Sequence, residues 1–275
     1  MRLDVLLADS GRCRSRARAA ALIKAGGVCV DGVVVRKPAQ LVHIDQVIVV
    51  ADPAAEFVGR GAAKLASALM DFGLVADGRI AADLGASTGG FTQVLLRAGA
   101  RRVFAVDVGH GQLAPEVAAD PRVVERSGVH VKDLEALAAL APCDLVVADL
   151  SFISVTAAFP ALHLLLGADA DAVVLIKPQF EAGRAALNGH GVVADPEIRV
   201  AALTGVLAAA VADGFNILGV TPCAVSGERG NREVFAWLRQ DPVGACLPPS
   251  AIKWAVRQDG VVCAQPEPSA SKFRL

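Results

Sequence analysis

From position 80 onward, apolar residues fall into short runs that alternate with stretches of helical spacing. Stretches such as FTQVLLRAG (91–99) and DLEALAALA (133–141) have helical spacing and separate neighbouring runs. Short apolar runs between helices predict a doubly wound, mostly parallel α/β sheet. The runs that predict strands are IAADL (80–84), RVFAVDV (102–108), RVVER (122–126), DLVVADL (144–150), AVVLIKP (172–178), NILGVTPC (216–223) and REVFAWL (232–238).

The first fifty residues follow a different pattern and predict a small α+β unit. Leu3, Leu6 and Leu7 share one face of a first expected helix. A second helix is expected over about 15–24. The next run, VCVDGVVV (28–35), holds an Asp-Gly pair between two β-rich halves, which is a strong hairpin signal. This unit therefore has its own helices, hairpin and apolar core.

A change in composition separates the two parts of the chain. The segment ADPAAEFVGRGAAKL (51–65) contains a proline and two glycines, which is typical of a linker that enters a new helix. We therefore predict a first domain over 1–52, a linker over 53–62, a second domain over 63–242 and a C-terminal extension over 243–275 with a mobile distal end.

Charge is distributed unevenly along the chain. The whole sequence has 27 Lys and Arg against 28 Asp and Glu, so the overall balance indicates no particular partner. Residues 1–50, however, carry eight basic and four acidic side chains. An excess of positive charge on a small unit favours contact with a polyanion such as RNA.

The cysteines and the hydropathy pattern exclude several classes of protein. The six cysteines form no C-x-x-C pair and do not cluster with the five histidines, so neither a metal site nor a disulfide framework is expected. No apolar run approaches the roughly 18 residues that span a bilayer. We therefore expect a cytoplasmic protein that does not bind membranes.

The loop after the first predicted strand of the second domain, DLGASTGGFT (83–92), has the features of a cofactor-binding turn. Its glycines follow the spacing G-x-x-x-G-G rather than the G-x-G-x-x-G that binds a pyrophosphate. Asp107 ends the next strand, where a carboxylate can accept hydrogen bonds from both hydroxyls of a ribose. This combination favours S-adenosylmethionine, with a nicotinamide cofactor and a purely structural turn as the alternatives.

Two further strands carry charged residues at their carboxyl ends. Asp149 follows LVVA, and Lys177 follows AVVLI. A lysine at the end of an apolar strand is costly to bury without a partner, and Asp149 on the neighbouring strand can supply one. A structural ion pair is the alternative, but the position beside the cofactor loop favours a catalytic pair.

Six motifs stand in order along the chain: VGRGAAKL (58–65), DLGASTGGFT (83–92), DVGHGQL (107–113), DLVVADLSFIS (144–154), IKPQFE (176–181) and SGERGNREVF (226–235). They resemble the motifs of TlyA-like ribosomal RNA methyltransferases. The first fifty residues, RLDVLLADSGRCRSRARAAALIKAGGVCVDG among them, also resemble the S4 RNA-binding domain of that family. The resemblance implies a Rossmann-like, FtsJ-like methyltransferase domain that uses S-adenosylmethionine.

The resemblance also implies the residues that act. The catalytic tetrad of the family matches Lys64, Asp149, Lys177 and Glu233. The cofactor-binding positions match Gly85, Ser87, Gly89, Phe91 and Asp107. The RNA-binding positions of the S4 unit match Arg2, Arg14, Arg16 and Arg18. Gly128 departs from the pattern, because relatives often carry an asparagine there that would contact the adenine.

The expected activity is 2′-O-methylation of cytidine in ribosomal RNA, in one or both subunits. The implied partners are rRNA and ribosomal subunits, without an obligate protein partner. Two alternatives are a non-catalytic ribosome-assembly factor that binds RNA and a membrane-active hemolysin, a name the family has carried. The intact tetrad argues against the first alternative, and the lack of a membrane-spanning run argues against the second.

Overall fold

The computed structural model describes residues 1–10, 12–13, 16–25, 27–43, 46–50, 57–240, 247–258 and 260–263. The chain forms two compact units, Met1–Phe57 and Val58–Leu275. Residues 53–56 of the predicted linker and the distal end of the predicted extension lie outside the described residues.

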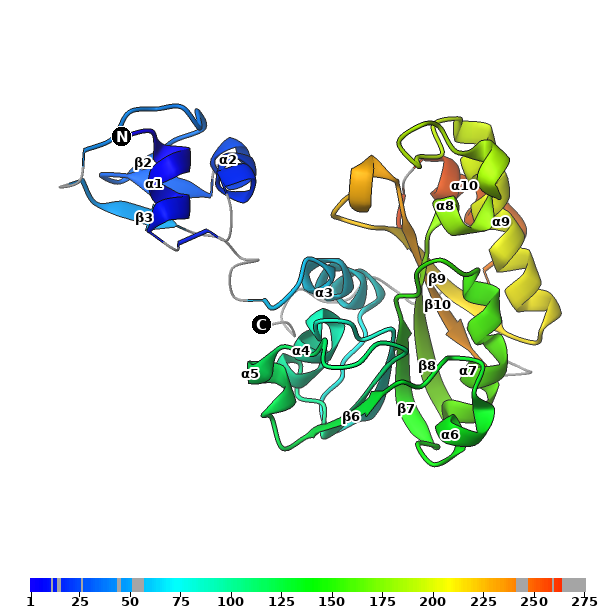
Figure 1. Ribbon diagram of the computed structural model, residues 1–275. Helices are drawn as coiled ribbons and strands as arrows, with labels where there is room; N and C mark the ends of the chain where they lie inside the picture. Colours follow the sequence, from blue (N-terminus) through cyan, green and yellow to red (C-terminus); the bar gives the residue numbers. More distant parts are fainter. Residues whose placement is uncertain are drawn as a thin grey trace. The chain divides into compact units, whose positions relative to one another are not determined.

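The first unit consists of two helices and a small antiparallel sheet (Figure 1). Asp31 and Gly32 both have positive φ, which is the backbone geometry of a tight hairpin turn. Leu3, Leu7 and Ile23 are fully buried in its core. The elements are α1 (Leu3–Asp9), α2 (Arg16–Ala25), β1 (Val28–Val30), β2 (Val33–Val34) and β3 (Ile48–Val50), with strand order β2-β1-β3.

Asp4 is a buried carboxylate in the first turn of α1, and two arginines bind it. Arg2 donates two hydrogen bonds to it through Nε and Nη2, at 3.0 and 2.9 Å. Arg16 Nε donates a third at 3.1 Å. The Arg2 guanidinium, aided by Arg16, holds the pKa of Asp4 well below its usual range. The network therefore joins the N-terminal residues to the start of α2.

The second unit has the doubly wound architecture that the apolar runs predict. Its eight-stranded sheet has the order β11-β9-β10-β8-β7-β4-β5-β6. The pairs β4–β5, β4–β7, β5–β6 and β7–β8 are parallel, whereas β10 is antiparallel to both β8 and β9. The strands are β4 (Ile80–Leu84), β5 (Arg102–Asp107), β6 (Val123–Ser127), β7 (Cys143–Ala148), β8 (Leu166–Ile176), β9 (Asn216–Pro222), β10 (Val234–Arg239) and β11 (Val262–Cys263).

Helices cover both faces of this sheet, with α3 and α4 on one face and α6, α7 and α9 on the other (Figure 1). The described part of the predicted extension adds α10 and the edge strand β11, which pairs with β9. The helices are α3 (Gly61–Phe72), α4 (Gly90–Arg97), α5 (Pro115–Ala118), α6 (Leu134–Ala138), α7 (Phe159–Leu165), α8 (Pro178–Glu181), α9 (Pro196–Ala212) and α10 (Pro249–Gln258), with 3₁₀ turns at Val155–Ala158, Arg184–Ala186 and Glu228–Gly230.

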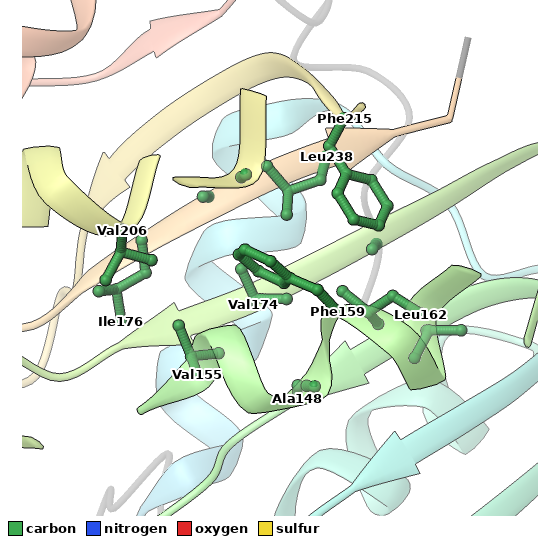
Figure 2. Packing of buried hydrophobic residues seen from close by; sticks show 14 of the residues in the cluster. Ala148, Val155, Phe159, Leu162, Val174, Ile176, Val206, Phe215 and Leu238 are labelled. Atoms are coloured by element: carbon green, nitrogen blue, oxygen red, sulfur yellow. The ribbon is translucent and has the colours of Figure 1, made fainter. Parts of the chain in front are cut away.

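The largest part of the core lies between the sheet and the helices α6, α7 and α9 (Figure 2). Phe159 of α7 meets Phe215, with ring centroids 5.6 Å apart and planes inclined by 57°. Val174 and Ile176 of β8 pack into the same cluster. Burial of this strand on both faces fixes where its carboxyl end, and therefore Lys177, emerges from the sheet.

Replacement of Asp4 by asparagine is expected to reduce the acid sensitivity of the first unit. Because the pKa of Asp4 is lowered in the folded state, its ion pairs stabilise that state above the unfolded pKa of about 3.9, and this stabilisation is lost as the pH falls below that value. Urea unfolding of the full chain, followed by NMR amide signals of residues 2–43, measures the effect. Between about pH 5 and about pH 2 the midpoint should fall more in the native protein than in Asp4→Asn. An equal fall in both proteins would contradict this role.

Candidate active site

The loop after β4 is shaped by glycines that no other residue could replace without strain. Gly85 and Gly89 have φ values of +88° and +91°. A Cβ on Gly85 would lie 2.5 Å from the backbone oxygen of Asp149, and one on Gly89 would meet Leu113 and Val117 at 3.0 Å. The loop therefore packs tightly against β7 and α5, and α4 begins directly after it at Gly90.

Asp107, at the end of β5, is held to this loop by a hydrogen bond. Its Oδ2 accepts a hydrogen bond from the backbone N–H of Ser87 at 2.8 Å, and its Oδ1 accepts one from Gly109 at 2.7 Å. These two bonds fix the carboxylate and leave lone pairs on both oxygens for a ligand.

A cavity of about 350 Å³ opens between the carboxyl ends of the parallel strands. This is where open α/β sheets bind their ligands. Its wall is mixed, with apolar residues beside polar groups that include the Asp107 carboxylate. We call it the cofactor cavity; residues at or just after the ends of β4, β5, β6 and β7 line it, among them Leu84, Gly85, Ser87, Asp107, Val129 and Leu150.

A second cavity, also of about 350 Å³, adjoins the first and contains all four residues of the predicted tetrad. Lys64 Nζ of α3 lies 2.5 Å from Glu233 Oε2, and Lys177 Nζ lies 2.5 Å from Asp149 Oδ1. Lys64, Lys177 and Glu233 are each less than a tenth exposed. We call this the tetrad cavity; it shares Gly85, Ser87, Asp149 and Ser151 with the cofactor cavity.

The antiparallel direction of β10 explains how Glu233 reaches this cluster. Val234, the first residue of β10, is paired with Ile176, the last residue of β8. Glu233 and Lys177, which flank this pair, therefore lie at the same end of the sheet. A Cβ on Gly227 would collide with the Glu233 carboxylate, so the turn before β10 closes over that group.

Two of the predicted cofactor residues, Phe91 and Gly89, do not line the cofactor cavity. Phe91 is buried in α4, lines the tetrad cavity, and packs on Phe235 with ring centroids 6.0 Å apart. Gly89 shapes the loop without lining either cavity.

At Gly128 a Cβ would lie 2.6 Å from His110 Nε2, so the histidine ring fills the space of a side chain there. The described residues after β6 that line the cofactor cavity are Val129, His130 and Val131.

Asp83 lies beneath the loop and was not singled out by the sequence. It is fully buried, and Thr92 Oγ1 donates a hydrogen bond of 2.7 Å to its Oδ2. Burial raises the pKa of Asp83 to about 7. Its Oδ1 has no hydrogen-bond partner in the part of the chain that the structure describes. Burial therefore disfavours the charged form of this carboxyl beneath the loop.

A third cavity, of about 640 Å³, lies beside Lys177 and was also missed. Phe152 is 89% exposed, has a φ of +68°, and lies 5.4 Å from Phe180 between ring centroids. Arg184 and Arg229 line the same cavity. Phe152 and Phe180 fall inside the quoted motifs DLVVADLSFIS and IKPQFE, so their aromatic character was the available signal.

In the first unit, the structure places two of the four predicted RNA-binding arginines. Arg2 and Arg16 converge on Asp4, while their side chains remain 44% and 58% exposed. Arg14 and the side chain of Arg18 lie outside the described residues.

The described residues contain neither a cluster of metal ligands nor a membrane-spanning helix. No group of three or more histidine, cysteine or acidic side chains is placed to hold a metal ion within the described ranges. The described helices also include none that is both long and apolar enough to cross a bilayer.

Comparisons with known proteins agree with the geometry. The family model of FtsJ-like methyltransferases matches residues 57–240, and that of the S4 domain matches residues 1–48. The chain is 45% identical over 239 residues to the 16S/23S rRNA (cytidine-2′-O)-methyltransferase TlyA of Mycobacterium tuberculosis, covering 86% of this chain and 89% of that protein. It is 37% identical to Hemolysin A of Brachyspira hyodysenteriae, covering 86% of this chain and 98% of that protein.

A solved structure extends the similarity to three dimensions. A Streptococcus thermophilus protein named as a hemolysin superposes with a TM-score of 0.70 at 33% identity, covering 94% of this chain and 95% of the other. Sequence family and fold therefore agree. The chain belongs to the TlyA-like family of FtsJ-like methyltransferases that carry an N-terminal S4 domain.

Proposed function

We propose that this protein transfers a methyl group from S-adenosylmethionine to the ribose 2′-hydroxyl of a cytidine in ribosomal RNA. The observation that carries the proposal is the tetrad cavity, where two buried lysine–carboxylate pairs adjoin the cofactor cavity. The named activity of the Mycobacterium tuberculosis relative supports the choice of cytidine in 16S or 23S rRNA. An rRNA substrate in turn implies a cytoplasmic protein.

The residues of the cofactor cavity fit S-adenosylmethionine. Gly85 lines the cavity and carries no side chain, so that a ligand can approach its backbone. Asp107 is placed to accept hydrogen bonds from the ribose hydroxyls, and Val129 and Leu150 offer apolar surfaces to a purine. When bound, the cofactor supplies an electrophilic methyl group. Because the two cavities share a wall, a bound cofactor would present that methyl group to a substrate in the tetrad cavity.

The tetrad acts chiefly by positioning. A ribose hydroxyl is a weak nucleophile, so its oxygen must be held in line with the methyl carbon and sulfur. Lys177 is the group that we assign to this oxygen, either as the acceptor of its proton or as a charged donor that orients it. Lys64, Glu233 and Asp149 hold the cluster close to neutral and fix its geometry.

The third cavity suits the substrate nucleotide. RNA-binding proteins stack splayed-out bases on exposed aromatic rings, and Phe152 presents such a ring beside Lys177. Arg184 and Arg229 are suited to the flanking phosphates. In the first unit we assign phosphate contacts to Arg2 and Arg16, and by sequence to Arg14 and Arg18, within a domain that we place at residues 1–52.

Replacement of Lys177 by alanine is expected to abolish methyl transfer and leave cofactor affinity unchanged. Loss of a group that handles the reacting proton lowers kcat by roughly 100-fold to 10,000-fold. Transfer of labelled methyl to ribosomal subunits and free rRNA, followed by nucleoside mass spectrometry, gives the rate and the product. The exposed Lys132→Ala is the matched control. Full activity of Lys177→Ala would refute the assignment, and no label with the native protein would favour the assembly-factor alternative.

Replacement of Asp107 by alanine is expected to weaken cofactor binding. Hydrogen bonds to a charged acceptor contribute about 1.5–3 kcal/mol, so the Kd for S-adenosylmethionine should rise by roughly tenfold to 100-fold. Isothermal titration calorimetry measures this directly, with the exposed Glu135→Ala as control. An unchanged Kd would place the ribose elsewhere.

Replacement of Arg16 by alanine is expected to weaken RNA binding and make it less dependent on salt. Each lost phosphate contact lowers the slope of log K against log salt concentration by about 0.7–0.9. Arg36→Ala removes the same charge from another part of the same unit and serves as control. Equal losses in both variants would show that charge alone, rather than this face of the unit, binds the RNA.

A further inference from the structure

The contacts of the Lys177 ammonium group are of two kinds. Its Nζ lies 2.5 Å from Asp149 Oδ1, yet that oxygen has no partner with hydrogen-bond geometry. Ser151 Oγ, in contrast, accepts a hydrogen bond from Nζ at 3.0 Å. Among the residues that the structure describes, Ser151 is therefore the group that gives the ammonium a directed bond.

This difference matters because an ammonium group can turn about its Cε–Nζ bond. It has three equivalent N–H groups, and a carboxylate contact without hydrogen-bond geometry fixes the position of the group more than its rotation. A second, directed acceptor selects one rotational state, so that the remaining N–H groups, or the lone pair after deprotonation, point in a fixed direction. Catalytic groups gain from this kind of support when it comes from a rigid neighbour.

Ser151 is itself held from both sides. Two residues earlier, the Asp149 N–H donates to Leu84 O at 3.0 Å, which ties the start of the loop to β4. Farther along, Glu181 accepts hydrogen bonds from Ser154 Oγ at 2.6 Å and from the Val155 N–H at 2.8 Å. The loop that carries Ser151 therefore has fixed ends, although the serine is exposed.

The position of Ser151 also fits a role at the reacting centre. It lines the cofactor cavity, the tetrad cavity and the third cavity, so it lies where all three meet. We propose that Ser151 is a positioning residue that sets the orientation of the Lys177 ammonium toward the hydroxyl to be methylated. This inference rests on the proposed function, because it assigns Ser151 to the same transfer.

The test compares Ser151→Ala, Ser151→Thr and Ser151→Cys with the native protein in the methyl-transfer assay on ribosomal subunits. Without the acceptor oxygen, kcat should fall about tenfold or more, while KM for the cofactor and for RNA changes less than about twofold. Threonine keeps the hydroxyl and should restore most of the rate. Cysteine keeps the size but is a weak acceptor, so it should behave like alanine. Ser67→Ala in α3 is the control for a serine of the same unit.

The outcomes separate this inference from the proposed function. A kcat for Ser151→Ala within about twofold of the native value, or a change confined to KM, overturns the positioning role. Equal losses in the alanine and threonine variants also overturn it, because the hydroxyl would then not be the cause. A native protein that methylates no RNA overturns the proposed function and this inference together. Thermal unfolding and cofactor titration of each variant show whether a loss of rate comes from misfolding.

Discussion

Two lysines can be buried in the second unit only because a carboxylate meets each of them. Removing an ammonium group from water costs several kcal/mol, and a partner at contact distance offsets that cost only when the geometry is fixed. Lys64 and Glu233 are separated by 169 residues in sequence, and Lys177 and Asp149 follow adjacent strands. The pairing therefore requires the starts of α3 and β10 to meet the ends of β7 and β8, and the three cavities open there.

Much of this arrangement follows from the sequence. The apolar runs predict the strands β4 to β7 closely, and the glycine spacing with Asp107 predicts the cofactor loop. Strand direction is harder to predict, because apolar alternation does not distinguish a parallel from an antiparallel neighbour. The insertion of β10 between β8 and β9 depends on long-range packing, and this insertion brings Glu233 to Lys177. Without the family resemblance, Lys64 and Glu233 would be ordinary helix and loop charges.

Other parts of the site carry no pattern that a sequence can reveal. Ser151 follows a strand as many serines do, and only its 3.0 Å bond to Lys177 distinguishes it. Arg2 and Arg16 can be predicted as basic residues of an RNA-binding unit, but their shared partner Asp4 depends on how α1 and α2 pack. Phe152 is exposed and its backbone adopts a left-handed conformation, and residue type alone predicts neither property.

The close approach of Gly85 to Asp149 has a consequence for how this site can change. Any side chain at position 85 would press on the backbone that carries Asp149, because only 2.5 Å separates the added carbon from that carbonyl oxygen. Gly85, which lines the cofactor cavity, thus touches the backbone of the residue that pairs with Lys177. A substitution that changes the cofactor cavity at Gly85 would therefore also move the carboxylate that pairs with Lys177, so these two features of the site change together.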